Sequence, residues 1–208
     1  MLVALKLDEF AKVLGSDAPA PGGGSVAALS GALGAELVCM VCRLSIGKKG
    51  LEEHQTLVAD VLEKAEKVAK SLMLRVDLDT QAFNRVMAAF KLPKETDDEK
   101  KARTGAIQEG YKEAVQSPLS IARECVSVLH LAQSATGKSN TNAISDLGVA
   151  AMQAYAGLEG AVMNVKINLP SIKDEAFNAK TLSETATLLE DGRKARDNVY
   201  AYVSGSIG

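Results

Sequence analysis

Residues 52–90 read EEHQTLVADVLEKAEKVAKSLMLRVDLDTQAFNRVMAAF, and apolar side chains recur in this stretch at helical spacing. The recurring positions are Leu57, Val61, Leu72, Val76, Phe83, Met87 and Phe90. Steps that fit a period of about 3.6 residues are typical of one face of an amphipathic α-helix. Pro93 ends the pattern, because proline lacks the amide hydrogen that a helix interior needs. We therefore predict a long helix over residues 52–90, with a break or kink within its length.

The remainder of the chain favours the same kind of element. No run of four to eight β-branched or aromatic residues alternates with polar residues, as a half-buried strand would. Aromatic residues make up only 4% of the chain and apolar residues 47%, so the core must pack small side chains closely, which suits helices. The predicted fold class is all-α: a single-domain helical bundle of long antiparallel helices over residues 1–208.

Capping residues and helix breakers mark the limits of the other predicted helices. These helices cover Leu7–Leu14, Ser25 to about Ile46, Thr96 through Val115, Ser117 to near Gly137, Asn142–Leu169, and Ser171 or Asp174 to about Tyr202. Thr96 with Glu99 forms a capping box. Ser117 followed by Pro118 is typical of an N-cap and a first helical residue, so we predict two helices between residues 96 and 137.

Charge and composition exclude several classes of partner. The formal net charge is −2, so no surplus of basic side chains is available to neutralise a nucleic-acid backbone. The most apolar stretch, residues 26–42, is too short to cross a bilayer, contains glycines and carries Glu36. The N-terminus has no signal-peptide pattern, and the three cysteines are an odd number in a chain that needs no disulfides. We expect a cytoplasmic protein that binds neither nucleic acid nor membrane.

Asp79 is the first candidate functional residue. It lies three residues after Val76 and four before Phe83, on the apolar face of the helix, so the pattern predicts its burial. A buried carboxylate needs a partner, a bound cation or a raised pKa. A structural carboxylate and a functional one fit this pattern equally well. Asp77 falls on the polar side, and we predict that it is a solvated surface residue.

A second candidate is one face of the helix predicted over residues 142–169. Polar and small residues follow one another there at three- and four-residue steps: Asp146, Ala150, Gln153, Gly157, Gly160 and Asn164. Two glycines inside a helix cost about 1 kcal/mol each relative to alanine, which is tolerable if something occupies the space they leave. Either a ligand or a closely packed second helix satisfies the pattern, and close helix packing is the simpler interpretation.

The third candidate is the triple glycine at residues 22–24, before Ser25. Bare backbone N–H groups at a helix N-terminus favour an anion or a polar ligand, although a flexible turn explains the glycines as well. Lys48 follows the same helix and can meet a carboxylate-bearing ligand or remain solvated. His54 and His130 stand isolated, so we predict no metal site. Carboxylates are then the plausible acid–base groups.

Six segments, taken in order, resemble one enzyme family. They are APAPGGGSVAALSGALGAELVCMVC (18–42), IGKKG (46–50), DTQAFNRVM (79–87), LPKETDDEKKAR (92–103), NTNAISDLGVAA (140–151) and NVKIN (164–168). The chain resembles the cyclodeaminase/cyclohydrolase family of folate enzymes nearly end to end. Within that family it is most similar to the stand-alone methenyltetrahydrofolate cyclohydrolases.

The resemblance implies an all-helical homodimer with a folate site near the glycine loop, a tetrahydrofolate derivative as substrate, and no cofactor. It implies hydrolysis of 5,10-methenyltetrahydrofolate to 10-formyltetrahydrofolate. The alternatives are formimidoyltetrahydrofolate cyclodeaminase activity, with ammonia release, and a non-catalytic folate-binding helical dimer. On the family's pattern the catalytic residues are Asp79 and Asp146. The substrate-binding residues are Gly22, Gly23, Gly24, Ser25, Asn142, Ser145, Asn164 and Lys48.

Overall fold

The computed structural model describes residues 1–208 and contains helices and no strands, which confirms the predicted all-α fold class. The α-helices are α1 (Leu7–Leu14), α2 (Gly23–Arg43), α3 (Gln55–Phe90), α4 (Asp97–Ala135), α5 (Ile144–Asn168) and α6 (Glu175–Ile207). Four 3-10 turns cover Leu2–Ala4, Glu52–His54, Thr141–Ala143 and Leu169–Ser171. α3 is one continuous helix of 36 residues, so the predicted break within it is absent.

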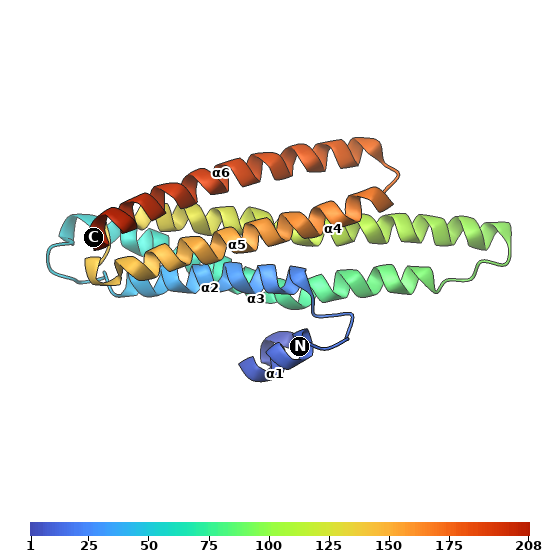
Figure 1. Ribbon diagram of the computed structural model, residues 1–208, viewed down its shortest axis with the longest axis horizontal. Coiled ribbons are helices and arrows are strands. Elements are labelled where there is room, and N and C mark those ends of the chain that lie inside the picture. The colour runs from blue at the N-terminus through green and yellow to red at the C-terminus, as the bar shows by residue number, and fades with distance from the viewer.

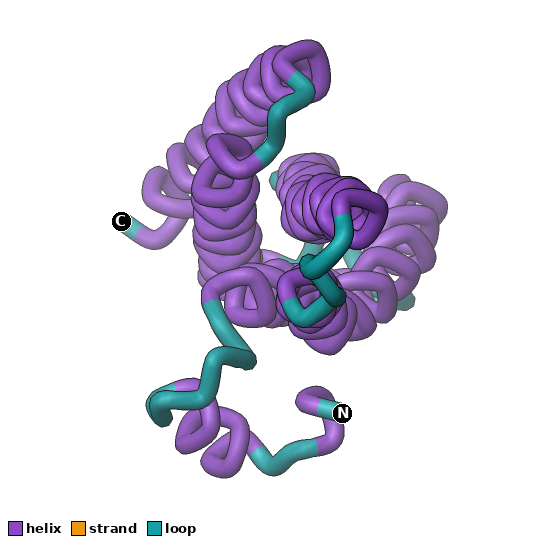
Figure 2. Tube along the Cα trace, turned by 90° about the vertical axis from the view of Figure 1, so that its right-hand side faces the viewer, coloured by secondary structure: helices purple, strands orange, loops and turns teal.

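Helices α2 to α5 form a four-helix bundle in which successive helices run in opposite directions (Figure 1). α2 packs against α3 and α5, and α4 packs against the same two helices from the other side. α6 lies along the outside of α4 and α5. The N-terminal segment with α1 lies to one side of the four-helix bundle, as the end-on view in Figure 2 shows, and its first residues contact α3. The hairpin of α3 and α4 projects beyond the start of α2 (Figure 1).

Small side chains allow α2 and α5 to approach closely at the centre of the bundle. A Cβ atom on Gly34 would lie 2.8 Å from the carbonyl oxygen of Ala150, and one on Gly157 would lie 2.7 Å from that of Ala27. Ser30 also donates to the backbone carbonyl of Gln153 at 2.8 Å. The middle of the polar, small-residue face of α5 is therefore a helix-packing surface, the simpler of its two predicted roles.

α2 is the one helix that is long and apolar enough to cross a membrane, and 61% of its most apolar window is buried within the protein's own fold. Its buried side chains are mostly alanine, valine and cysteine. It is thus a core helix of the bundle, packed against α3 and α5.

The predicted boundary at Ser117 is wrong, because α4 continues through Pro118. A proline inside a helix removes one backbone hydrogen bond and costs about 3 kcal/mol. Leu119 and Ile121, which follow it, are almost completely buried, and this burial offsets the cost. The Ser117 hydroxyl faces Asp79 of α3 at 3.5 Å and caps no helix.

The start of α2 also differs from the prediction. α2 begins at Gly23, with Gly22 as its N-cap, so Ser25 is not the cap. Ser25 is fully buried, and its hydroxyl donates to the carbonyl oxygen of Val76 at 2.8 Å, which ties α2 to α3. The capping box of Thr96 and Glu99 is present as predicted.

Candidate functional site

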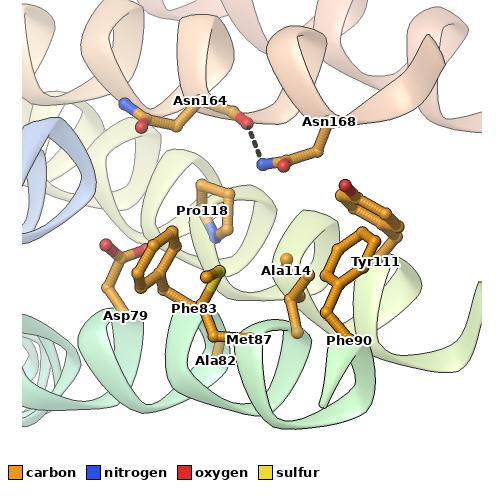
Figure 3. A pocket seen from close by; sticks show the side chains of 11 residues that line it. Asp79, Ala82, Phe83, Met87, Phe90, Tyr111, Ala114, Pro118, Asn164 and Asn168 are labelled. Carbon is orange, nitrogen blue, oxygen red and sulfur yellow. Dashed lines mark hydrogen bonds between the residues drawn. The ribbon is translucent and has the colours of Figure 1, made fainter. Parts of the chain in front are cut away.

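A cavity of about 240 Å³ lies between α3, α4 and α5, just beyond the N-terminus of α2 (Figure 3). Its lining residues are Asp79, Ala82, Phe83, Val86, Met87, Phe90, Tyr111, Ala114, Pro118, Asn164 and Asn168. A mostly apolar pocket with a few convergent polar groups is typical of a small-molecule site. The cavity lies where the α3–α4 hairpin extends past the start of α2, so that α2 does not cover this part of α3.

Aromatic and aliphatic side chains form the walls of the cavity. The rings of Phe90 and Tyr111 meet edge to face, with centroids 6.2 Å apart and planes 85° apart. Phe83, Met87 and Phe90 remain 37%, 43% and 41% exposed, although apolar side chains of this size are usually buried. Such walls suit a flat ligand with an aromatic ring system.

Polar side chains also line the cavity: Asn164 and Asn168 from α5, and Asp79 from α3. The Asn168 side-chain amide donates to the Asn164 carbonyl oxygen at 2.9 Å, and the Asn164 amide donates to the carbonyl oxygen of Gly160 at 2.8 Å. Both side-chain oxygens remain available to accept hydrogen bonds. The Asp79 carboxyl group lies across the cavity, on α3 (Figure 3). A ligand in the cavity would therefore have a carboxylate at one edge and amides at another.

Pro118 gives the cavity wall a further polar feature. Because proline has no amide hydrogen, the carbonyl oxygen of Ala114, one turn earlier on α4, cannot accept its normal helical hydrogen bond. Ala114 and Pro118 both line the cavity. The proline thus frees a backbone acceptor at the wall of the site.

Asp79 is partly buried, in the direction that its position on the apolar face predicts. Burial raises the pKa of its carboxyl group, and hydrogen bonds from the Ser117 hydroxyl and the Ser25 backbone amide act in the opposite direction. The carboxylate thereby faces the N-terminus of α2, where the free amides carry partial positive charge. The raised pKa, the cavity and the absence of an ion pair favour a functional carboxylate over a purely structural one.

The glycine loop makes room for two side chains of the site. A Cβ atom on Gly24 would lie 2.3 Å from Oδ2 and 2.4 Å from Oδ1 of Asp79. A Cβ atom on Gly23 would lie 3.1 Å from the amide nitrogen of Asn164, whereas Gly22 has no neighbour within 4 Å. Gly23 and Gly24 therefore allow Asp79 and Asn164 to lie against the start of α2. The anion that faces this helix N-terminus is the carboxylate of Asp79.

The other predicted site residues lie at the opposite end of the bundle. Asp146 and Asn164 both belong to α5, and their separation of 18 positions corresponds to about 27 Å along the helix. Asn142 and Ser145 precede Asp146 and are exposed. Lys48 contacts the side-chain oxygen of Asn140 at this same end. Within one chain, the structure thus brings Gly23, Gly24, Asp79 and Asn164 together and separates them from this second group.

The prediction for Asp77 is wrong. Its Oδ1 atom accepts a 2.6 Å hydrogen bond from the backbone amide of Leu2, and its Oδ2 atom is buried without a partner. The N-terminal segment folds back onto α3 and covers the polar side of the helix there. Asp77 anchors that segment, and helical periodicity carries no information about such a distant contact.

Several residues that line the cavity are not among the predicted site residues. Phe83, Met87 and Phe90 were predicted as positions of the buried face, and Tyr111 and Asn168 were not singled out. A signal was nevertheless present, because the three α3 side chains lie four, eight and eleven residues after Asp79. They therefore share its helix face. A carboxylate on the same helix face as aromatic rings is more typical of a pocket wall than of a hydrophobic core.

No three His, Cys, Asp or Glu side chains meet in a metal-binding group. The three cysteines are free and buried, as expected of core residues. Burial raises the pKa of Cys39 to about 11, and that of Cys42 and Cys125 to about 12. Such thiols are protonated at neutral pH and are poor nucleophiles or ligands.

The raised pKa of Asp79 makes both activity and stability depend on pH in a defined direction. If the ionised carboxylate acts on the ligand, kcat/KM should fall as the pH drops through the raised pKa, above the ordinary value of 3.8. For stability, the folded chain binds this proton more tightly than the unfolded chain. Its contribution to the free energy of unfolding is therefore full below pH 3.8 and is lost as the pH rises through the raised pKa.

The Asp79→Asn variant, which cannot titrate at this position, provides the comparison for stability. Urea denaturation of both proteins across this pH range should show wild type losing stability relative to the variant as the pH rises. Parallel stability curves would contradict a raised pKa at Asp79.

Comparisons with known proteins find similar sequences and a similar structure. Residues 6–187 match the family described as formiminotransferase-cyclodeaminase. The chain is 43% identical over 201 residues to a methenyltetrahydrofolate cyclohydrolase of Methylorubrum extorquens, and the match covers 97% of each chain. It is 36% identical to the formimidoyltransferase-cyclodeaminase of Gallus gallus, of which it spans 37%. The crystal structure of a Thermotoga maritima formiminotetrahydrofolate cyclodeaminase superposes with a TM-score of 0.90 at 27% identity, over the whole of both chains.

Proposed function

This chain belongs to the formiminotransferase-cyclodeaminase family, and we propose that it hydrolyses 5,10-methenyltetrahydrofolate to 10-formyltetrahydrofolate. The observation that carries the proposal is the 43% identity, over nearly the full length of both chains, to a methenyltetrahydrofolate cyclohydrolase. The formimidoyltransferase-cyclodeaminases are less similar and much longer, since this chain spans 37% of the chicken protein. The cavity supports the proposal because it pairs aromatic walls with a carboxylate.

The substrate's ring system fits the chemistry of the cavity. The pyrimidine ring of the tetrahydropterin is flat and conjugated, and the rings of Phe83, Phe90 and Tyr111 offer apolar faces and edges to it. Its ring nitrogens and amino group can hydrogen-bond to the side-chain amides of Asn164 and Asn168. The methenyl carbon carries a delocalised positive charge between N5 and N10, which a neighbouring Asp79 carboxylate stabilises.

Asp79 also supplies the base that hydrolysis requires. Water attacks the methenyl carbon while the carboxylate takes its proton, and a neutral tetrahedral adduct forms. The bond from this carbon to N5 then breaks as N5 takes up a proton. The adduct's hydroxyl group gives its own proton to solvent at the same time, so that the carbon becomes the formyl carbonyl on N10 and one proton is released overall. The raised pKa of Asp79 suits both steps, because a weakly acidic carboxyl group can accept the proton from water and return it to N5.

Replacing Phe83 with alanine should raise KM about 10-fold and change kcat much less. Removing one ring that stacks on an aromatic ligand costs about 1–3 kcal/mol, and 1.4 kcal/mol corresponds to a factor of 10. Steady-state kinetics would measure both constants. Leu74→Ala serves as the control, because Leu74 is a 52% exposed apolar residue of the same helix that does not line the cavity. An unchanged KM for the Phe83 variant would show that the pterin does not bind against this wall.

The second candidate function uses the same cavity for ring closure. In formimidoyltetrahydrofolate cyclodeamination, N10 attacks the formimino carbon on N5 and ammonia leaves. The longer relatives and the Thermotoga maritima structure carry this name. A third possibility is a dimer that binds folate without turnover, and the Asp79 carboxylate poised in the cavity argues against it.

One pair of assays separates these functions. Methenyltetrahydrofolate has an absorbance band that disappears on hydrolysis, and ammonia release reports deamination of formimidoyltetrahydrofolate. We expect enzyme-dependent loss of the methenyl absorbance without ammonia release. Ammonia release without hydrolysis would instead establish the cyclodeaminase, and ligand-induced stabilisation without either reaction would establish a binding protein.

We further propose that the protein is a cytoplasmic homodimer that needs no cofactor and binds neither nucleic acid nor membrane. Its unpaired, buried cysteines are consistent with a reducing compartment. Large apolar side chains remain exposed along α2 and α5, among them Leu33 (49%), Val149 (49%) and Met163 (66%). An apolar surface of this kind supports an interface between protein chains.

A further inference from the structure

The polar atoms of the cavity that lack a partner are mainly hydrogen-bond acceptors. Asn164 and Asn168 each use their NH2 group on a backbone carbonyl of α5, which leaves their side-chain oxygens without a partner. The Asp79 carboxylate is an acceptor too, and the Ser117 hydroxyl already donates to it. A ligand that fills this cavity must therefore present several donors.

Pro118 adds a further acceptor to the same wall. Carbonyl groups in an α-helix point toward the residue four positions later, so the Ala114 carbonyl points toward Pro118. Proline has no amide hydrogen, and this carbonyl therefore lacks its normal helical partner. Both residues line the cavity, so both ends of the missing hydrogen bond lie at its wall (Figure 3).

The Ala114 carbonyl oxygen needs a partner when a ligand is bound. Ala114 is half-buried, and a ligand in the cavity would shield its carbonyl from water. A shielded acceptor without a hydrogen bond is costly, so the site favours a ligand that donates to it. It disfavours one of the same shape that lacks the donor.

We propose that the Ala114 carbonyl oxygen accepts a hydrogen bond from the 2-amino group of the pterin, so that Pro118 makes the site specific for a 2-amino heterocycle. The proposal rests on the proposed function for its substrate. One edge of a tetrahydropterin carries the 2-amino group between N–H groups at N3 and N8, and this edge supplies the donors that the wall requires. The second N–H bond of the amino group remains free for an asparagine oxygen.

The position of Ala114 relative to Asp79 fits this orientation. Ser117, which contacts Asp79, lies three residues after Ala114, or about 4.5 Å along the axis of α4. N5 lies across the bicyclic ring system from the 2-amino group. When the amino group binds at Ala114, N5 and the methenyl carbon are therefore directed toward the Asp79 carboxylate.

Replacing Pro118 with alanine tests the proposal, because it restores the amide hydrogen that occupies the Ala114 carbonyl. Calorimetry under anaerobic conditions would measure the dissociation constants of tetrahydrofolate and of its 2-deamino analogue. Wild type should bind tetrahydrofolate about 10-fold more tightly than the analogue, which corresponds to about 1.4 kcal/mol. In Pro118→Ala the ratio should fall to about 2-fold or less, because the carbonyl has a partner with either ligand.

Two further variants separate the amide hydrogen from the shape of the wall. Pro118→Val restores the same hydrogen with a side chain close to proline in volume, so its ratio should match that of Pro118→Ala. Met87→Ala shortens another apolar side chain of the cavity and leaves the backbone of α4 unchanged. It should weaken the binding of both ligands and keep the ratio of wild type. Both Pro118 variants gain a helical hydrogen bond, so urea denaturation should show no loss of stability.

A wild-type ratio in both Pro118 variants would overturn the proposal, and so would equal binding of the two ligands by wild type. A ratio that falls in Pro118→Ala but not in Pro118→Val would assign the effect to the shape of the wall, and would also overturn it. In each of these outcomes wild type still hydrolyses methenyltetrahydrofolate. A wild-type protein that neither binds tetrahydrofolate nor hydrolyses methenyltetrahydrofolate would contradict the proposed function itself.

Discussion

Replacing Asp79 with asparagine is expected to lower kcat for methenyltetrahydrofolate hydrolysis by about 10²–10⁴-fold, the typical contribution of a positioned acid–base group. Asparagine has nearly the same shape but can neither accept the proton from water nor balance the cationic methenyl carbon. Because burial raises the pKa of this carboxyl group, removing it should not destabilise the fold at neutral pH. Stopped or continuous absorbance assays measure kcat, and urea denaturation measures stability.

Asp77→Asn is the matched control for this substitution. Asp77 is an aspartate of the same helix, two residues away, and its carboxylate accepts a hydrogen bond from the N-terminal segment and does not line the cavity. Its asparagine variant should retain kcat. Equal losses in both variants would assign the effect to the charge of the helix and not to the cavity.

Replacing Gly24 with alanine is expected to lower kcat by about 10²-fold, with the chain still folded. The new methyl group would occupy a position 2.3 Å from Oδ2 of Asp79, so the carboxylate must rotate away. A displacement of about 1 Å in a catalytic group is enough to cost about 10²-fold in rate. The clash involves the end of a side chain, so the helices need not separate. Kinetics combined with circular dichroism would show the loss of activity and the preserved helicity.

Gly22→Ala provides the comparison within the same glycine loop. A Cβ atom on Gly22 meets nothing within 4 Å, and its extended backbone accepts any residue. As an N-cap substitution it should cost no more than about 1 kcal/mol of stability and leave kcat unchanged. If the Gly22 variant lost as much activity as the Gly24 variant, flexibility of the loop, and not space for Asp79, would explain the glycines.

Helical periodicity and capping residues predicted the fold well, and the exceptions have local causes. The capping box at Thr96 and the long helix before Pro93 are present because local signals and tertiary packing agree there. The predicted helix start at Pro118 is wrong because burial of the residues that follow outweighs the local preference of proline for a helix start. Contacts distant in sequence, such as that of Leu2 with Asp77, leave no periodic signal.

The site was predictable in part for the same reason. Asp79 stood out because a carboxylate on an apolar helix face is costly, and Gly24 because it belongs to a run of three glycines at a predicted helix start. Gly24 makes room for Asp79 because of the way α2 packs on α3. Spacing along the sequence carries no information about that packing. The separation of Asp146 from Asp79 follows from the direction of α5, and no pattern within one helix reveals it.

The most direct test of the proposed function follows the methenyltetrahydrofolate absorbance with wild-type enzyme, with the Asp79→Asn variant and without protein, at one pH. We expect wild type to accelerate loss of the absorbance well above the uncatalysed rate, with 10-formyltetrahydrofolate as the product, and the variant to lie close to that rate. A wild-type rate equal to the uncatalysed rate would contradict hydrolysis as the function of this chain. A variant as fast as wild type would contradict Asp79 as the residue that performs it.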